Sequence, residues 1–210
     1  MRQFLKQLIG VRINPVIRVL VASDILIFSA FGLLGPVFAI FLLENIQGGS
    51  AKVAGFAAMV WLLTRAIFAI PISLLIDHWS GERDDFWFVF WGSLGISFVP
   101  IAYLFASLPI HVYLIQAFYG FCHAAVFPSW FAIFTRHIDR HKEGEEWATY
   151  ITATDLGAAA AAAAGGVIAV TLGFKVLFIL ASLFSFLGAF LLLWIRLRCK
   201  IGWRIKCERR

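Results

Sequence analysis

Four ionisable residues interrupt long apolar stretches of this chain. Asp24, Arg65, His123 and Asp155 each stand within a stretch long and apolar enough to cross a lipid bilayer. Ionisable groups in such segments are costly and usually mark a pathway for ions or solutes. Asp24 is predicted to load a proton or to contact a solute. Arg65 is predicted to form an ion pair with Asp24 or to tune its pKa, with a purely structural ion pair as the alternative.

The residues around His123 recur at helical spacing. Gln116, Gly120, His123, Phe127 and Trp130 are three or four residues apart, so one face of a helix carries them all. Amide, imidazole and flat aromatic groups suit the wall of a cavity for a polar solute. A helix-packing face with one satisfied histidine is the alternative interpretation.

Six apolar runs must position these side chains. The chain is 61% hydrophobic and only 14% charged, whereas soluble domains average about 25% charged residues. Continuous runs favour helices over the alternating strands of a membrane barrel. We therefore predict an all-α membrane protein with six transmembrane helices. Their predicted ranges are 16–43, 52–76, 86–107, 109–135, 146–172 and 174–196, and Gly173 should turn the last two into an antiparallel hairpin.

Most of the 18 Lys and Arg residues fall on one predicted side of the membrane. Because Lys and Arg concentrate in cytoplasmic loops, both termini are predicted to be cytoplasmic, in a plasma or inner membrane. This placement also argues against a nucleic-acid partner, despite the net charge of +6. The three cysteines are scattered, so no metal site or cofactor is predicted. The predicted regions are a cytoplasmic amphipathic head over 1–15, the bundle over 16–196, and a basic tail over 197–210 that either binds anionic lipid or acts as a stop-transfer cluster.

Small residues dominate the fifth apolar run. Gly157 is followed by unbroken alanine over 158–164 and then by Gly165 and Gly166. Small side chains let helix backbones approach closely in lipid, where tight packing drives helix association. This helix is therefore predicted to pack on several sides.

Several segments together resemble a known family. The first helix contains Gly32, Gly35 and Pro36, the loop after the second helix runs from Ser73 to Arg83 around Asp77 and Gly81, and the fourth helix contains Gln116, Gly120 and Pro128. Over about residues 12–198 the chain is similar to the amino-terminal half of a major facilitator superfamily transporter. It departs from the family pattern where Ser73 replaces a glycine, Glu82 replaces a basic residue and Gln116 replaces an arginine.

The resemblance implies one six-helix half of a transporter that usually has about twelve helices, with both halves oriented alike in the membrane. A chain of this kind is expected to pair with a second copy as a parallel homodimer around one central cavity. Helices 1 and 4 would line the cavity, helices 2 and 5 would form the seam between copies, and helices 3 and 6 would face lipid. The residues assigned in this way are Gly157, Ala161, Gly165 and Gly166 at the seam, and Asp77, Gly81 and Arg83 in a gating loop.

The predicted function is secondary active transport of a small polar solute by alternating access, coupled to protons, with a sugar slightly favoured. Asp24 is the first choice for the proton-coupling carboxylate and Asp155 the second. The alternatives are an exporter of amphipathic drugs and a non-transporting membrane scaffold. An enzyme is disfavoured because no nucleophile accompanies His123 and Asp155. The predicted partners are a second copy, the solute, protons and membrane lipid, and the predicted substrate-binding residues are Gln116, Tyr119, His123, Trp130 and Trp61.

Overall fold

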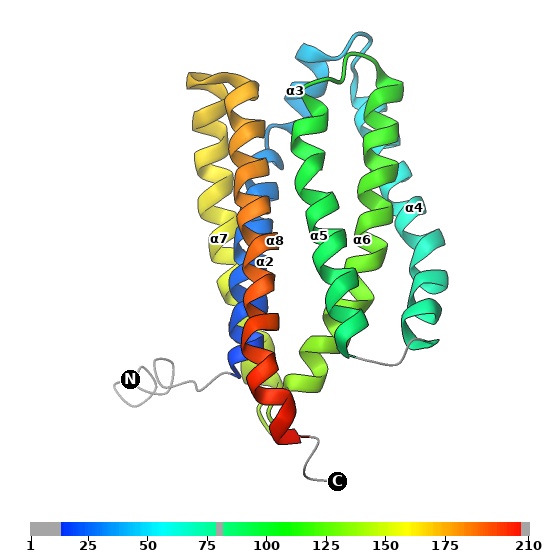
Figure 1. The fold of residues 1–210 in the computed structure, drawn as a ribbon. Coiled ribbons are helices and arrows are strands. Elements are labelled where there is room, and N and C mark those ends of the chain that lie inside the picture. Colours follow the sequence, from blue (N-terminus) through cyan, green and yellow to red (C-terminus); the bar gives the residue numbers. More distant parts are fainter. Residues whose placement is uncertain (1–13, 79–81, 207–210) are drawn as a thin grey trace.

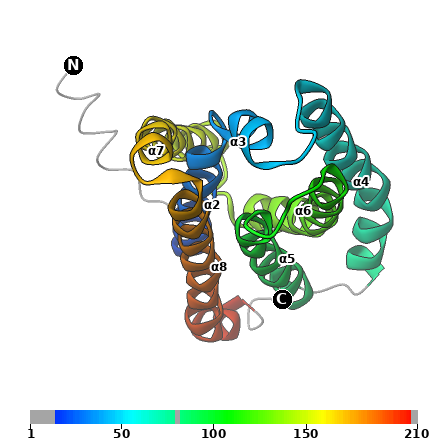
Figure 2. The same ribbon diagram turned by 90° about the horizontal axis from the view of Figure 1, so that it is seen from above.

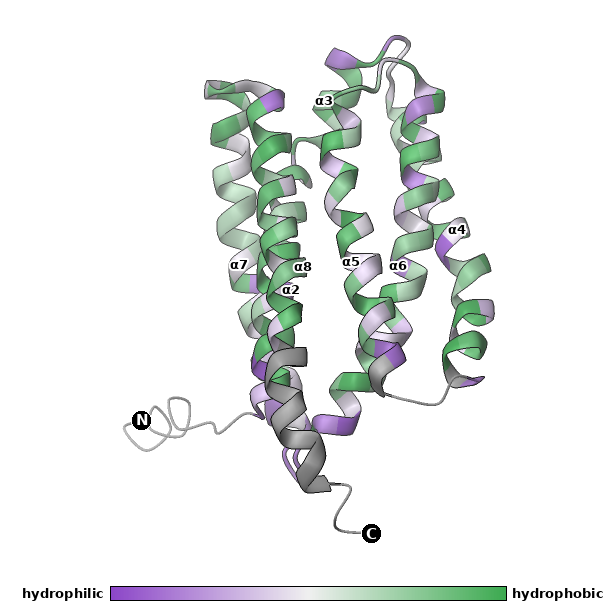
Figure 3. Ribbon diagram, in the orientation of Figure 1, coloured by the Kyte–Doolittle hydropathy of each residue, from purple (hydrophilic) through white to green (hydrophobic). Residues whose placement is uncertain are grey.

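Seven helices make up the described part of the chain. The computed structural model describes residues 14–78 and 82–206, and for 77, 82–83 and 195–206 the backbone alone. Within these ranges the structure has helices and no strand, and six helices are long and apolar enough to cross a membrane, which confirms the predicted fold class. Apolar residues cover the spans, and polar residues gather toward the helix ends (Figure 3). The helices are α2 (Pro15–Leu34), α3 (Phe38–Asn45), α4 (Ala51–His78), α5 (Glu82–Tyr103), α6 (Pro109–His137), α7 (Glu143–Thr171) and α8 (Gly173–Lys206) (Figure 1).

The first predicted helix is broken into two. We expected one helix over 16–43, but α2 ends at Leu34 and α3 begins at Phe38. Pro36 lies between them, and proline lacks the N–H group that an uninterrupted helix needs at this point. The chain turns there through a bond from Val37 N to Leu34 O at 3.1 Å.

The last two spans form the predicted hairpin. Only Leu172 separates α7 from α8, and Gly173 adopts a φ of 81°, a left-handed conformation that glycine accepts without strain. The helix α8 continues to Lys206 rather than ending at residue 196, although its apolar span ends at Trp194. The backbone of the predicted basic tail is therefore helical over most of its length.

The six spans form two groups of three. The helix α2 packs against α7 and α8, α6 packs against α4 and α5, and α5 contacts α8. Seen from above, α7, α2, α6 and α4 follow one another in a row, and α5 and α8 lie along one side of it (Figure 2). We call α7, α2, α6 and α4 the four-helix row. This row carries the four ionisable residues that were singled out within the spans, Asp24, Arg65, His123 and Asp155.

Hydroxyl groups join α5 to α8 on the side of the row. Buried Ser97 hydrogen-bonds the hydroxyl of Ser185 at 2.9 Å, and Ser182 donates to the carbonyl of Ser97 at 2.7 Å. These two helices were expected to face lipid. Their inner faces are buried, while Trp91 and Phe98 remain exposed on α5. The two helices therefore hold the bundle together and present only their outer faces to the surroundings.

An ion pair links α5 to the end of α6. The Arg136 guanidinium contacts the Asp85 carboxylate, whose side chain is 3% exposed, while that of Arg136 is 44% exposed. Removing the cation leaves a buried carboxylate without compensation.

We expect Arg136→Gln to lower the free energy of unfolding by about 1–3 kcal/mol, below the value for a fully buried pair because solvent screens the half-exposed arginine. Chemical unfolding in detergent measures this change. Adding Asp85→Asn should restore most of the loss, since the buried charge is then gone. Equal stability of the single and double variants would contradict this account.

Candidate functional site

A stack of three rings joins three helices of the four-helix row. Phe31 of α2 and Tyr119 of α6 lie parallel, with centroids 5.0 Å apart and planes 2° apart. Trp61 of α4 stacks on Tyr119 at 5.5 Å and 17°. Gly120 permits this closeness, because a Cβ there would collide with the Trp61 carbonyl. The stack fixes the relative depth of α2, α6 and α4.

Arg65 lies against two aromatic rings next to this stack. Its guanidinium carbon is 5.4 Å from the Trp61 ring centroid and 5.0 Å from that of Phe127. Aromatic faces attract cations at such distances, most strongly when water is excluded. The His123 ring lies 5.8 Å from Trp61 and 5.7 Å from Phe127. We call Phe31, Trp61, Arg65, Tyr119, His123 and Phe127 the Arg65 cluster.

Three hydrogen-bonding groups of the Arg65 cluster lack partners among the residues that the structure describes. The Arg65 guanidinium makes no hydrogen bond or ion pair with any residue that the structure describes. Trp61 Nε1 and His123 Nδ1 are buried and also lack hydrogen-bond partners within those residues. Each such buried atom costs about 1–3 kcal/mol when it stays unsatisfied. The cluster can therefore offer donors to a ligand that carries acceptor oxygens.

Asp24 belongs to a second group, between α2 and α7. Its half-buried carboxylate accepts a hydrogen bond from Tyr150 Oη at 3.0 Å. Asp155 follows on α7 and is exposed, whereas the preceding Thr154 is buried and donates to the Tyr150 carbonyl at 2.9 Å. We call Asp24, Tyr150 and Asp155 the Asp24 group.

The two groups lie at similar depth in the bundle. Phe31 and Trp61 are level with each other because both stack on Tyr119. Asp24 comes seven residues before Phe31, about 10 Å along the helix, and Arg65 comes four residues after Trp61, about 6 Å. Both displacements run toward the same end, since α2 and α4 are antiparallel (Figure 1). A carboxylate and a guanidinium thus lie within about one helical turn of the same depth.

The expected ion pair between Asp24 and Arg65 is not formed. Asp24 bonds to Tyr150 of α7, and Arg65 contacts aromatic rings of α4 and α6. The reason is the packing order, because α2 binds α7 on one flank while α4 binds α6 on the other.

The predicted substrate-binding residues divide between the cluster and the core. Trp61, Tyr119 and His123 contact one another, and Gln116 is half-buried one turn before Gly120. Trp130 does not join them. It is 4% exposed and packs against Phe134 and Tyr150, with ring centroids 4.8 Å away in each case. In this structure Trp130 is a core residue, contrary to the prediction.

Most of the small residues assigned to a seam between copies instead contact other helices of the same copy. A Cβ at Gly157 would lie 2.9 Å from Ser29 Oγ, and one at Gly165 would collide with the backbone of Leu33. Ala161 packs against the buried core. Gly166 alone of the four has open space beside it. Gly157 and Gly165 therefore serve the contact between α7 and α2.

The predicted gating loop cannot be placed. Gly81 and the side chains of Asp77 and Arg83 lie outside the described residues.

Sequence reasoning missed Tyr150, Phe31 and, as a contact of Arg65, Phe127. Tyr150 is a hydrogen-bonding residue inside an apolar run, five positions before Asp155, and that signal could have drawn attention to it. Phe31 carried no signal, because phenylalanine is abundant throughout the spans.

The comparisons with known proteins agree with this architecture. The model of the Major Facilitator Superfamily matches residues 20–201. A search of curated proteins returned no significant match. The family match covers most of the chain, including all of the Arg65 cluster and the Asp24 group. The chain is a multi-pass membrane protein that belongs to the major facilitator superfamily of transporters.

Proposed function

We propose that the protein is a secondary active transporter that moves a small polar solute, coupled to protons, by alternating access between two parallel copies. The observation that carries this proposal is the four-helix row, which places a cationic aromatic cluster and a hydrogen-bonded carboxylate at similar depth. Aromatic faces suit the flat surface of a sugar or another polar ring, and a carboxylate inside a membrane suits proton coupling. Asp24 is the proposed proton site, and Asp155 is an exposed second candidate.

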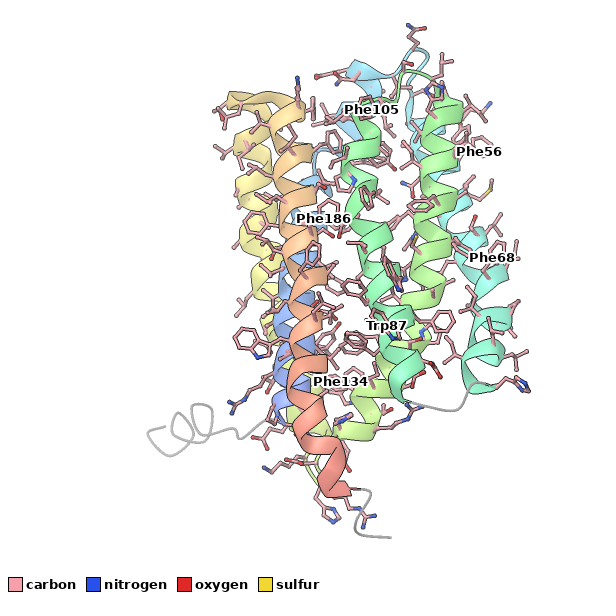
Figure 4. The ribbon with its side chains drawn as sticks, in the orientation of Figure 1. Phe56, Phe68, Trp87, Phe105, Phe134 and Phe186 are labelled. Atoms are coloured by element: carbon pink, nitrogen blue, oxygen red, sulfur yellow. The ribbon has the colours of Figure 1, made fainter. Side chains whose placement is uncertain are left out.

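The ends of the row support a second copy as the partner. The helix α7 exposes Ala159, Ala160, Ala163 and Ala164, a small-residue face that lets another helix approach closely. At the opposite end, α4 carries Phe56, which is 42% exposed, and Phe68, which is 40% exposed and also contacts Phe121 of α6 (Figure 4). In a two-fold dimer, α7 of one copy would meet α4 of the other at each end of the row. This alanine face replaces the glycines as the proposed seam.

Uptake into liposomes tests the transport proposal. We expect the purified full chain to accumulate at least one labelled solute, from a panel of neutral sugars and sugar acids, when the outside is acidified, because the proton gradient drives entry. A protonophore should remove the accumulation and leave equilibration intact. The same preparation should have the mass of a dimer in detergent.

The alternatives give different results in this assay. A drug exporter would expel an amphipathic dye and leave sugars untouched, and a scaffold would move neither. A monomer that transports would contradict the two-copy arrangement.

Cytoplasmic termini remain a prediction, which labelling of an added terminal cysteine from either side of the membrane would check.

A further inference from the structure

We propose that the Arg65 cluster binds the carboxylate group of a small organic monoanion, so that the transported solute carries one negative charge. This inference rests on the proposed function and specifies its substrate class. It replaces the neutral sugar with a solute whose ring packs on aromatic faces and whose carboxylate meets Arg65.

The guanidinium of Arg65 is a cation that the described chain leaves without an anion. Its five N–H groups make no hydrogen bond to a described residue, and Asp24 is held by Tyr150 instead. Aromatic contacts on Trp61 and Phe127 stabilise the charge but accept none of those N–H groups. Arginine matches a carboxylate through two parallel hydrogen bonds, so an incoming carboxylate satisfies the donors that the described residues leave unpaired.

Two more polar atoms beside Arg65 lack a hydrogen-bond partner among the described residues. Trp61 Nε1 can only donate, and it has no acceptor among the described residues. His123 Nδ1 is likewise unpartnered there and can donate in one of its tautomers. Donors therefore outnumber acceptors around Arg65, which favours a ligand that brings oxygen acceptors rather than a cation.

The number of cations sets the charge of the ligand. Arg65 is the only Lys or Arg between Lys52 and Arg83, and the nearest Lys or Arg residues on α2 and α6 are Arg18 and Arg136 at the helix ends. One permanent cation balances one negative charge, so a carboxylate fits better than a dianionic phosphate. The exposed ring of Phe127 and the half-buried rings of Trp61 and Tyr119 then offer flat surfaces to the body of the solute.

Binding to matched pairs of probes tests the charge preference directly. The pairs are glucuronate with glucose and benzoate with benzyl alcohol, and titration calorimetry of the full chain in detergent measures each dissociation constant. We expect the anion of at least one pair to bind at least about tenfold more tightly than its neutral partner, because charge-assisted bonds to arginine are lost in the neutral molecule. Arg65→Gln should remove that preference, and Arg65→Lys should retain part of it.

Control variants separate recognition from general damage. Arg18→Gln removes a cation at the end of α2, away from the cluster, and should leave the preference unchanged. Trp61→Phe keeps an aromatic ring but deletes Nε1, and it should weaken anion binding severalfold and by a larger factor than it weakens neutral binding. If Arg65→Gln fails to fold, Trp61→Phe and the wild-type pairs still decide the question.

Three results would overturn the proposal: neutral probes that bind as tightly as the anions, no binding of either anion, or an Arg65→Gln variant that keeps the preference. Uptake of the same probes distinguishes this failure from failure of the transport proposal. Anion binding without any uptake supports the site and refutes transport, whereas uptake of glucose without anion binding supports transport and refutes the charge assignment.

Discussion

Asp24→Asn is expected to reduce proton-driven accumulation to the level of empty liposomes while exchange of solute across the membrane continues. Asparagine has nearly the same shape as aspartate, and its Oδ1 can still accept the hydrogen bond that Tyr150 donates at 3.0 Å. What it lacks is a carboxyl group that can bind and release a proton. The substitution thus removes coupling and preserves the contact between α2 and α7.

Counterflow of labelled solute against an internal unlabelled pool measures exchange, and uptake under an acid-outside gradient measures coupling. The pair of measurements distinguishes lost coupling from lost folding, because an unfolded variant fails both. Asp155→Asn is the matched control on α7, and it should retain most of the accumulation if Asp24 is the proton site.

Tyr150→Phe completes the comparison. It deletes the hydroxyl that contacts Asp24 but leaves the carboxyl group, so accumulation should persist with an altered dependence on external pH. Full accumulation by Asp24→Asn, together with its loss in Asp155→Asn, would transfer the coupling role to the exposed carboxylate. Full accumulation by both variants would refute proton coupling at either residue.

The spans could be predicted because their length and hydropathy follow from the thickness of the bilayer. Runs of about 20 apolar residues must cross as helices, so all six spans and the hairpin at Gly173 were visible in the sequence. The break in the first helix at Pro36 could also have been predicted from the sequence, since proline ends or kinks a helix in any solvent. It was overlooked because the apolar run continues through it.

The rotation of each helix about its axis could not be predicted. In a soluble protein the apolar face marks the core, but lipid is as apolar as a protein interior, and both sides of a membrane helix look alike in sequence. Trp130 illustrates this limit. It lies on the helical stripe of His123, yet the bundle turns it into the core against Phe134.

The hydrogen-bond and ion-pair partners of the polar side chains could not be predicted from the sequence for a related reason. Tyr150 lies 126 positions from Asp24, and only the packing of α7 on α2 brings them together. Opposite charge suggested Arg65 as the partner of Asp24, but charge alone does not say which helices are neighbours. Small residues have the same ambiguity, because they mark a close approach without naming the helix that approaches.

Two adjacent glycines of α7 allow that ambiguity to be resolved by one experiment. We expect Gly165→Ala to lower the free energy of unfolding by about 1–3 kcal/mol, because overpacking of a tight contact has this cost. The added Cβ would collide with the backbone carbonyl of Leu33 on α2, which cannot move aside as a side-chain end could. Chemical unfolding in detergent, followed by circular dichroism, measures the change.

Gly166→Ala is the matched control, since it places the same methyl group one residue further along the same helix. No described residue lies within 4 Å of a Cβ at Gly166, so this variant should be as stable as the parent or slightly more stable, because alanine is the better helix former. If the glycines instead form the seam between copies, the two variants would weaken dimerisation and leave the unfolding of each copy unchanged. A loss of stability confined to Gly165→Ala assigns this glycine to the contact between α7 and α2, and leaves the exposed alanines as the surface on which a second copy can pack.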